Sequence, residues 1–122
     1  MSEREPNLEV DVEIRDGRTA VLTVSGELDM ETADRLREVL AEQFGQGRRR
    51  VVLDLSALDF MDSSGLNVLI QAVIRAREAG GDLYLAGPTP AVRRILEITG
   101  VTTTLPPHDA VADALAAAGD AR

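Results

Sequence analysis

Three carboxylates and two serines stand close together in the middle of the chain. Asp54, Asp59 and Asp62 precede the serine pair at residues 63–64. Acidic side chains at the carboxyl end of a strand can hold Mg²⁺ and support phosphoryl transfer. Such sites usually add a lysine that neutralises the phosphoryl oxygens, but all 13 basic residues of this sequence are Arg. Because Asp54 also belongs to an expected strand and need not face the loop, metal-dependent catalysis is the weaker interpretation.

A nucleophilic role for either serine requires a general base nearby. The single histidine, His108, follows Pro106 and Pro107 at an expected helix start far along the chain. The stretch also lacks the glycine that precedes the serine in a nucleophile elbow. Because the chain has no cysteine, disulfides, thiolate nucleophiles and Cys-based metal sites are excluded. We therefore predict that the protein is not an enzyme and has no catalytic residue, metal site or cofactor of its own.

The elements around the serines favour a different role. Residues 50–55 form the short apolar run of a buried strand, and residues 63–78 have helical periodicity, so the serines stand at a helix start. Unpaired backbone N–H groups make such a position favourable for an anion. Ser63 or Asp62 can cap this helix, and a capping hydroxyl still lies at the surface. The apolar stripe expected for the helix comprises Leu66, Leu69, Ile70, Val73 and Ile74.

Residues beside this stretch can face either the core or a partner. We expect Phe60 and Leu66 in the core and Met61 as an exposed anchor, because methionine adapts to partner surfaces. Upstream, residues 48–50 are three consecutive arginines. We interpret them as a solvated turn, with a docking patch as the minor alternative.

The rest of the chain alternates strands and helices after an initial hairpin. Asp16 and Gly17 form a two-residue hairpin signal, and residues 26–29 are expected to break the second strand. The order β-β-α-β-α-β-α-(β)-α predicts an α/β fold, in which a single domain has a mixed β-sheet packed with about four α-helices. The expected strands cover residues 8–15, 18–25, 50–55, 82–86 and, at the edge, 102–105; the helices cover 30–44, 63–78, 90–98 and 110–118. The domain is placed at residues 8–117, with flexible termini at 1–7 and 118–122.

Composition limits the classes of partner. The net charge is −8 and only 2% of residues are aromatic, so we expect neither nucleic acid nor an anionic membrane as a partner. No segment approaches the roughly 18 apolar residues of a membrane span, and the N-terminus lacks the apolar region of a signal peptide. We therefore expect a cytoplasmic protein.

The central stretch also resembles a known signature. Residues 59–66, Asp-Phe-Met-Asp-Ser-Ser-Gly-Leu, are similar to the phosphorylation loop of anti-sigma factor antagonists, which are bacterial STAS-domain proteins. Residues 24–29, Val-Ser-Gly-Glu-Leu-Asp, resemble the Gly-Glu-Leu-Asp element of that family, and residues 91–101 resemble its third-helix segment. The motifs occur in family order and spacing, and the family's fold matches the element order above.

The resemblance implies a regulatory binding protein that switches partners. In that family the unphosphorylated antagonist binds an anti-sigma factor, which is also an ATP-dependent serine kinase, and so frees the sigma factor. The kinase phosphorylates the first serine of the motif, here Ser63, which releases the antagonist, and a serine phosphatase restores it. The partner-binding residues expected on this basis are Asp29, Asp59, Met61, Asp62, Ser64, Gly65 and Asn67.

Two features depart from the family pattern. Asn67 stands where many members have glycine, and the two prolines at 106–107 weaken the case for the last strand. Neither feature touches Ser63. The alternative function is a phosphorylation-independent STAS interaction module within a larger regulatory or transport assembly. We expect a monomer, because a switch needs its docking face to stay free.

Overall fold

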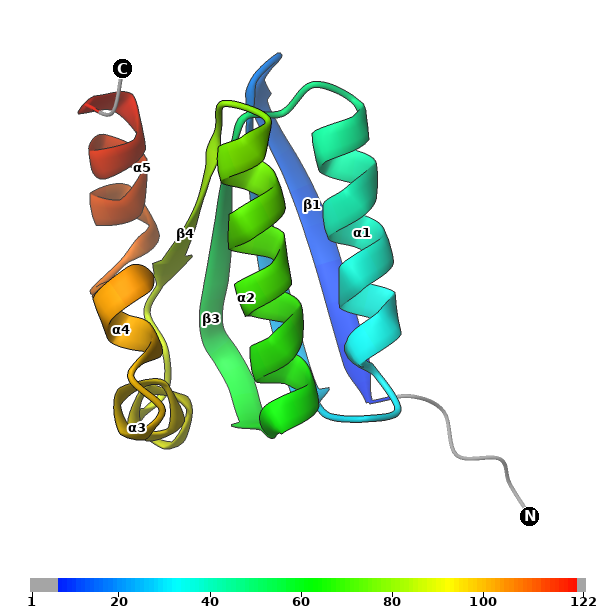
Figure 1. Ribbon diagram of the computed structural model, residues 1–122, viewed down its shortest axis with the longest axis vertical. Coiled ribbons are helices and arrows are strands. Elements are labelled where there is room, and N and C mark those ends of the chain that lie inside the picture. The colour runs from blue at the N-terminus through cyan, green and yellow to red at the C-terminus, as the bar shows by residue number, and fades with distance from the viewer. Residues whose placement is uncertain (1–6, 121–122) are drawn as a thin grey trace.

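The computed structural model describes residues 7–120, which form alternating strands and helices as expected (Figure 1). The strands are β1 (Leu8–Asp16), β2 (Thr19–Leu28), β3 (Arg50–Met61), β4 (Asp82–Ala86) and β5 (Pro107–His108). The helices are α1 (Ala33–Gly45), α2 (Ser63–Glu78), α3 (Pro90–Ile98), α4 (Val101–Thr104) and α5 (Val111–Asp120). The α/β fold with a mixed sheet is confirmed, with one short helix more than the expected four.

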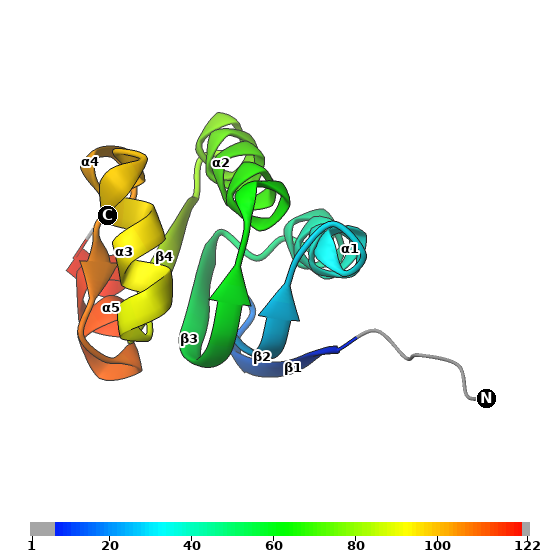
Figure 2. The ribbon, with the colours of Figure 1, turned by 90° about the horizontal axis from the view of Figure 1, so that it is seen from below.

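The five strands form one sheet in the order β1-β2-β3-β4-β5. β1 pairs with β2 antiparallel, and every later pair is parallel. Figure 2 shows α1 and α2 on the same face of the sheet. Leu53 and Leu55 of β3 belong to the core beneath these helices, whereas Val52 faces the opposite way and packs with Ala114 of α5. β3 is therefore covered on both faces, as its continuous apolar run predicts.

The hairpin that opens the chain differs from the expected one in the position of its turn and in the length of its second strand. Its turn falls on Gly17 and Arg18, one residue later than predicted. β1 is buried only near its start, because Val12 and Ile14 are exposed at the sheet edge. β2 does not stop at Gly26 but continues to Leu28. Glycine there adopts a φ of 103°, and the next amide donates to the Asn7 carbonyl at 2.7 Å. A left-handed residue thus bends the strand without ending it.

The expected edge strand at residues 102–105 is wrong. Gly100 has a left-handed φ of 81°, which turns the chain from α3 directly into α4, so the threonines there are helical despite their strand propensity. The edge strand lies at Pro107–His108 instead and pairs with β4. Proline is tolerated because this strand has no further neighbour that needs its N–H.

The last helix extends beyond the expected helix at residues 110–118. α5 runs to Asp120, and Ala118 is buried, so the fold continues past residue 117. At the other end Asn7 is hydrogen-bonded to β2. The remaining residues of the expected flexible termini, 1–6 and 121–122, lie outside the described residues. Within residues 7–120, no helix is long and apolar enough to span a membrane.

Candidate functional site

The site is organised by the carboxyl ends of two parallel strands. We expected β3 to end at Leu55 and an acidic loop to follow, but β3 continues to Met61. The extension exists because β2 is also longer than expected, and Leu28 pairs with Met61. α2 begins after the single residue Asp62. Ser63 is therefore placed by the sheet itself and not by a flexible loop.

The carboxyl half of β3 contains two bulges, which affect which side chains face the core. Residues 54–57 of β3 lie opposite 23–25 of β2, and residues 58–60 lie opposite 26–27, so β3 carries an extra residue at each place. An extra residue reverses the alternation of a strand. The two reversals cancel, so Met61 lies on the same core face as Leu53 and Leu55 and is 1% exposed, whereas Phe60 lies on the other face and is 47% exposed. The expectation of an exposed Met61 and a core Phe60 is therefore wrong, whereas Leu66 is buried as predicted.

The start of α2 is capped by Asp62 and leaves Ser63 free. The Asp62 carboxylate accepts hydrogen bonds from the amides of Ser64, at 2.8 Å, and Gly65, at 3.3 Å. The Ser63 side chain is exposed in the first turn, and its hydroxyl makes no hydrogen bond to any residue of the described chain. Of the two capping candidates the structure uses the carboxylate. The hydroxyl stands where the helix dipole favours negative charge.

Gly65 brings the first turn of α2 against the end of β2. A Cβ at this position would lie 2.6 Å from the Leu28 Cγ and 3.1 Å from its carbonyl oxygen. Gly65 is buried, so it positions the helix start and contributes no exposed side chain to the predicted partner surface. Ser64 is half-buried beside it.

The other predicted partner-binding residues lie around Ser63. The Asp29 carboxylate accepts from the amides of Glu31, at 2.9 Å, and Thr32, at 3.1 Å, and so fixes the turn between β2 and α1. Asp59 is exposed near the end of β3. Asn67 is exposed four residues after Ser63, on the same face of α2.

Sequence reasoning missed two exposed apolar residues at this end. Met30 is 79% exposed, and Phe60 is the second. Met30 was assigned to a helix starting at residue 30, but α1 begins only at Ala33, so Met30 lies in the preceding turn. The capping potential of Asp29 or Thr32 could have indicated the later start of α1. Continued alternation from Leu53 and Leu55 could have indicated that Phe60 faces away from the core that contains Met61.

Two of the three carboxylates considered for catalysis have structural partners. Asp54 accepts from the amide and hydroxyl of Ser56, at 3.0 and 2.8 Å. Asp62 is committed to the cap of α2. No group of three or more His, Cys, Asp or Glu within residues 7–120 could hold a metal ion. The His108 ring lies in β5, 6.4 Å from the ring of Tyr84.

Comparison with known proteins agrees with this geometry. Residues 9–114 match the model of the STAS domain family. The anti-sigma F factor antagonist of Paenibacillus polymyxa is 33% identical over 110 residues, which cover 89% of this chain and 93% of that protein. A crystal structure of an anti-sigma factor antagonist from Mycobacterium paratuberculosis is 33% identical, with a TM-score of 0.83 and coverage of 91% of this chain and 93% of that one. The chain therefore belongs to the STAS domain family.

Proposed function

We propose that this protein is an anti-sigma factor antagonist whose binding is controlled by phosphorylation of Ser63. The observation that carries the proposal is the Ser63 hydroxyl, which is exposed and unbonded within the described chain, at a helix start whose cap is already supplied by Asp62. Such a hydroxyl is accessible to a kinase without loss of a structural hydrogen bond. The names of the relatives support an anti-sigma factor as the partner.

The docking surface comprises residues that share the carboxyl end of β2 and β3 and the first turns of α2: Asp29, Met30, Asp59, Phe60, Ser63 and Asn67. Its two exposed apolar side chains are of the kinds enriched in protein interfaces, where aromatic and methionine side chains act as anchors. Met30 and Phe60 thus take the anchoring role that the sequence assigned to Met61.

Phosphorylation acts through charge and bulk. A phosphoserine adds about −1.5 to −2 charge at neutral pH. The helix dipole and the N–H groups of α2 tolerate this charge, and the Asp62 cap stays in place, so the fold survives modification. Asp59 and Asp29 add to the negative field on the docking surface, so the phosphate repels an acidic patch or fills space in a packed interface. A loss of about 3 kcal/mol in binding is roughly a hundredfold in affinity, which releases a partner.

The partners carry out both the phosphorylation and the dephosphorylation of the switch. We propose that the anti-sigma factor is itself the ATP-dependent serine kinase, that a separate serine phosphatase removes the phosphate, and that this chain catalyses no reaction. Mg²⁺-dependent turnover by the purified protein that disappears in Asp59→Asn would contradict this assignment.

The experiment is a pull-down from source lysate with and without ATP, followed by mass spectrometry of bait and captured proteins. We expect an anti-sigma factor of the kinase type in the fraction without ATP, and release of that protein together with a phosphate on Ser63 after ATP is added. Ser63→Ala should keep the partner in both conditions, whereas the neighbouring Ser64→Ala should behave like the natural chain. A stable partner with no phosphate on either serine would instead indicate a phosphorylation-independent STAS interaction module.

A second measurement tests the mechanism by which binding is lost. Ser63→Asp should weaken the isolated complex while leaving the backbone amide spectrum of the free protein close to that of the natural chain, apart from the first turn of α2. A broadly altered spectrum would mean that the negative charge acts through a change of fold and not at the surface.

A further inference from the structure

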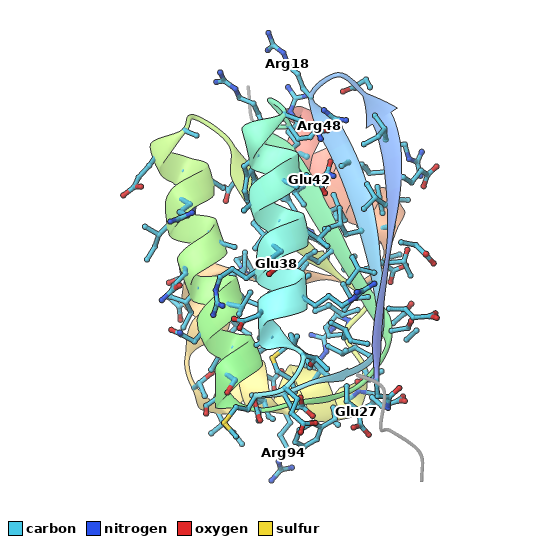
Figure 3. All side chains as sticks on the ribbon, turned by 90° about the vertical axis from the view of Figure 1, so that its right-hand side faces the viewer. Arg18, Glu27, Glu38, Glu42, Arg48 and Arg94 are labelled. Carbon is cyan, nitrogen blue, oxygen red and sulfur yellow. The ribbon has the colours of Figure 1, made fainter. Side chains whose placement is uncertain are left out.

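Arginines gather around a cavity at the end of the sheet opposite Ser63. The cavity has a volume of about 400 Å³ and is lined by Arg18, Arg49, Arg50, Gly80, Gly81, Asp82 and Tyr84. Arg50 begins the 12-residue strand β3 and Met61 ends it, so the two ends are separated by roughly 35 Å. In Figure 3, Arg18 and Arg48 mark this end of the molecule, whereas Glu27 and Arg94 mark the other.

Backbone hydrogen bonds build this cluster from three separate segments. The amides of Arg49 and Arg50 both donate to the Arg18 carbonyl, at 2.8 and 2.9 Å, and the Asp82 amide donates to the Arg49 carbonyl at 2.8 Å. A Cβ on Gly80 would lie 3.0 Å from the Arg49 Nη1, so the guanidinium extends over the turn between α2 and β4. The starts of β2, β3 and β4 thus hold the three arginines around one space.

The positive charges of this cluster are not paired within the described chain. None of the ion pairs among residues 7–120 includes Arg18, Arg49 or Arg50. Asp82, the carboxylate in the cavity wall, is engaged by Arg77 at 3.0 Å. The nearby Asp16 carboxylate accepts the Arg18 amide at 2.7 Å, and the charge of Arg50 contributes to the lowered pKa of Asp16. Three arginines therefore outnumber the carboxylates that face them, in a protein whose net charge is −8.

The chemistry of the wall identifies the class of ligand. Guanidinium groups present several N–H donors in a planar fork that matches phosphate oxygens. The amides of Gly80, Gly81 and Asp82 already bond to Arg77, Ala76 and Arg49, so recognition is left to side chains. Three guanidinium groups offer more N–H donors than a single phosphate needs. The Tyr84 side chain adds an aromatic ring and a hydroxyl to the cavity wall. We propose that this cavity is a binding site for a small anion that carries at least two linked phosphates.

Binding of an anion reduces the electrostatic repulsion between the arginines of the free protein. Like charges held close together repel one another, and an anion between them replaces that repulsion with charge-assisted hydrogen bonds. A ligand that binds only the folded state raises thermal stability as its concentration rises. The site does not depend on Ser63 or on the docking surface, so it can be tested independently of the proposed function.

The test is a titration of the full chain with inorganic pyrophosphate at constant ionic strength, followed by calorimetry and by thermal unfolding. We expect saturable binding and a rise in the unfolding temperature, with orthophosphate at least about tenfold weaker. Arg49→Gln and Arg50→Gln should each weaken binding by about tenfold, since each removes charged hydrogen bonds to the ligand. The matched control is Arg94→Gln, which removes the same charge at the opposite end and should leave the affinity unchanged.

Three outcomes would overturn the proposal: no saturable binding of pyrophosphate, equal affinity for orthophosphate, or an equal loss in the Arg94→Gln control, which would indicate unspecific attraction. A parallel titration with a nucleoside diphosphate distinguishes the sources of the ligand. Equal affinity supports recognition of the phosphates alone, and tighter binding supports an added contact of the base with Tyr84. Ser63→Asp should bind pyrophosphate like the natural chain, so a failure of the switch and a failure of this site are distinguishable.

Discussion

The two ends of the sheet carry charge in different ways. At the carboxyl end the carboxylates of Asp29 and Asp62 are fixed by hydrogen bonds from backbone amides, and each defines a turn or a helix start. At the amino end Arg49 and Arg50 are fixed only through their backbones, and their guanidinium groups have no ion pair within residues 7–120. The carboxylates that accept backbone hydrogen bonds fix the local structure of the surface, whereas the guanidinium groups without ion pairs are available to a ligand.

The ends also differ in how their geometry arises. The amino end is made by short turns between elements, such as the glycine pair at residues 80–81. The carboxyl end is made by the extension of β3 to Met61, in which Phe60 faces outward and Met61 inward, and by a glycine that lets α2 approach β2. At the carboxyl end, substitution of an inward side chain should therefore lower stability, and substitution of an outward side chain should weaken partner binding.

The largest expected effect comes from the inward side of that strand. Met61→Ala removes a fully buried side chain and should lower the free energy of unfolding by about 2–5 kcal/mol, because it leaves a cavity under α2. Phe60→Ala should cost less than about 1 kcal/mol, since about half of that side chain already faces solvent. Urea unfolding of both variants measures the difference.

For partner binding we expect the larger effect from Phe60→Ala and the smaller from Met61→Ala. Phe60→Ala should weaken the complex with the anti-sigma factor, and Met61→Ala should affect it only as far as it unfolds the protein. Equal unfolding costs for the two variants would contradict the inward position of Met61 and the outward position of Phe60 in β3.

The glycine at the start of α2 gives the next largest effect. Gly65→Ala places a Cβ 2.6 Å from the Leu28 side chain, so Leu28 or the helix must shift, and we expect a loss of about 1–3 kcal/mol in unfolding free energy. Gly45→Ala is the matched control at the end of α1, where nothing lies within 4 Å of the new methyl group. It should be neutral or slightly stabilising. If both alanine variants unfold alike, the close approach of α2 to β2 is not the reason for glycine at residue 65.

A smaller effect distinguishes Asp62, which caps α2, from Ser63, the proposed phosphorylation site. Asp62→Ala removes the acceptor for two helix amides and should cost about 1 kcal/mol of unfolding free energy, while Asp62→Asn should retain most of it. Ser63→Ala should cost close to nothing, because its hydroxyl has no partner in the described chain. Thermal unfolding of the three variants is the measurement. A Ser63→Ala cost as large as that of Asp62→Ala would mean that the hydroxyl is a structural group.

Local signals in the sequence were enough to locate the site around Ser63 at the carboxyl end of the sheet. The apolar run of β3, the helical periodicity of α2 and the Asp-Ser-Ser-Gly motif between them predict a helix start with an exposed serine. The antiparallel hairpin and the parallel strands follow from the same patterns, because periodicity and turn residues are properties of short segments.

The details that failed depend on contacts between distant segments. The extension of β3 to Met61, which places Phe60 on an exposed face of a strand, depends on the pairing of β3 with β2. The helical state of residues 101–104 follows from the turn at Gly100, and it overrides the strand propensity of three threonines. The proximity of Arg18 to Arg49 and Arg50 requires the register of the sheet, so the sequence alone showed a basic turn and not a cavity.

The smallest expected effect is a titration that tests the amino end directly. Tyr84 is the only tyrosine of the chain, so the ultraviolet signal of phenolate reports on it alone. Burial and the neighbouring Asp82 raise the pKa of Tyr84, while Arg50 and Arg77 oppose the shift. We expect ionisation above the ordinary phenol range in the folded protein. Asp82→Asn should lower this pKa and Arg50→Gln should raise it, whereas Asp113→Asn, on α5, should leave it unchanged.

The same shift predicts how stability depends on pH. A phenol whose pKa is higher in the folded than in the unfolded state holds its proton longer when folded, so its contribution to stability is complete below about pH 10 and is lost as the pH rises through the folded value. Unfolding midpoints in urea should therefore fall less steeply above pH 10 for Tyr84→Phe than for the natural chain. An ordinary tyrosine pKa, with identical slopes for the two proteins, would contradict the burial of Tyr84 and its proximity to Asp82.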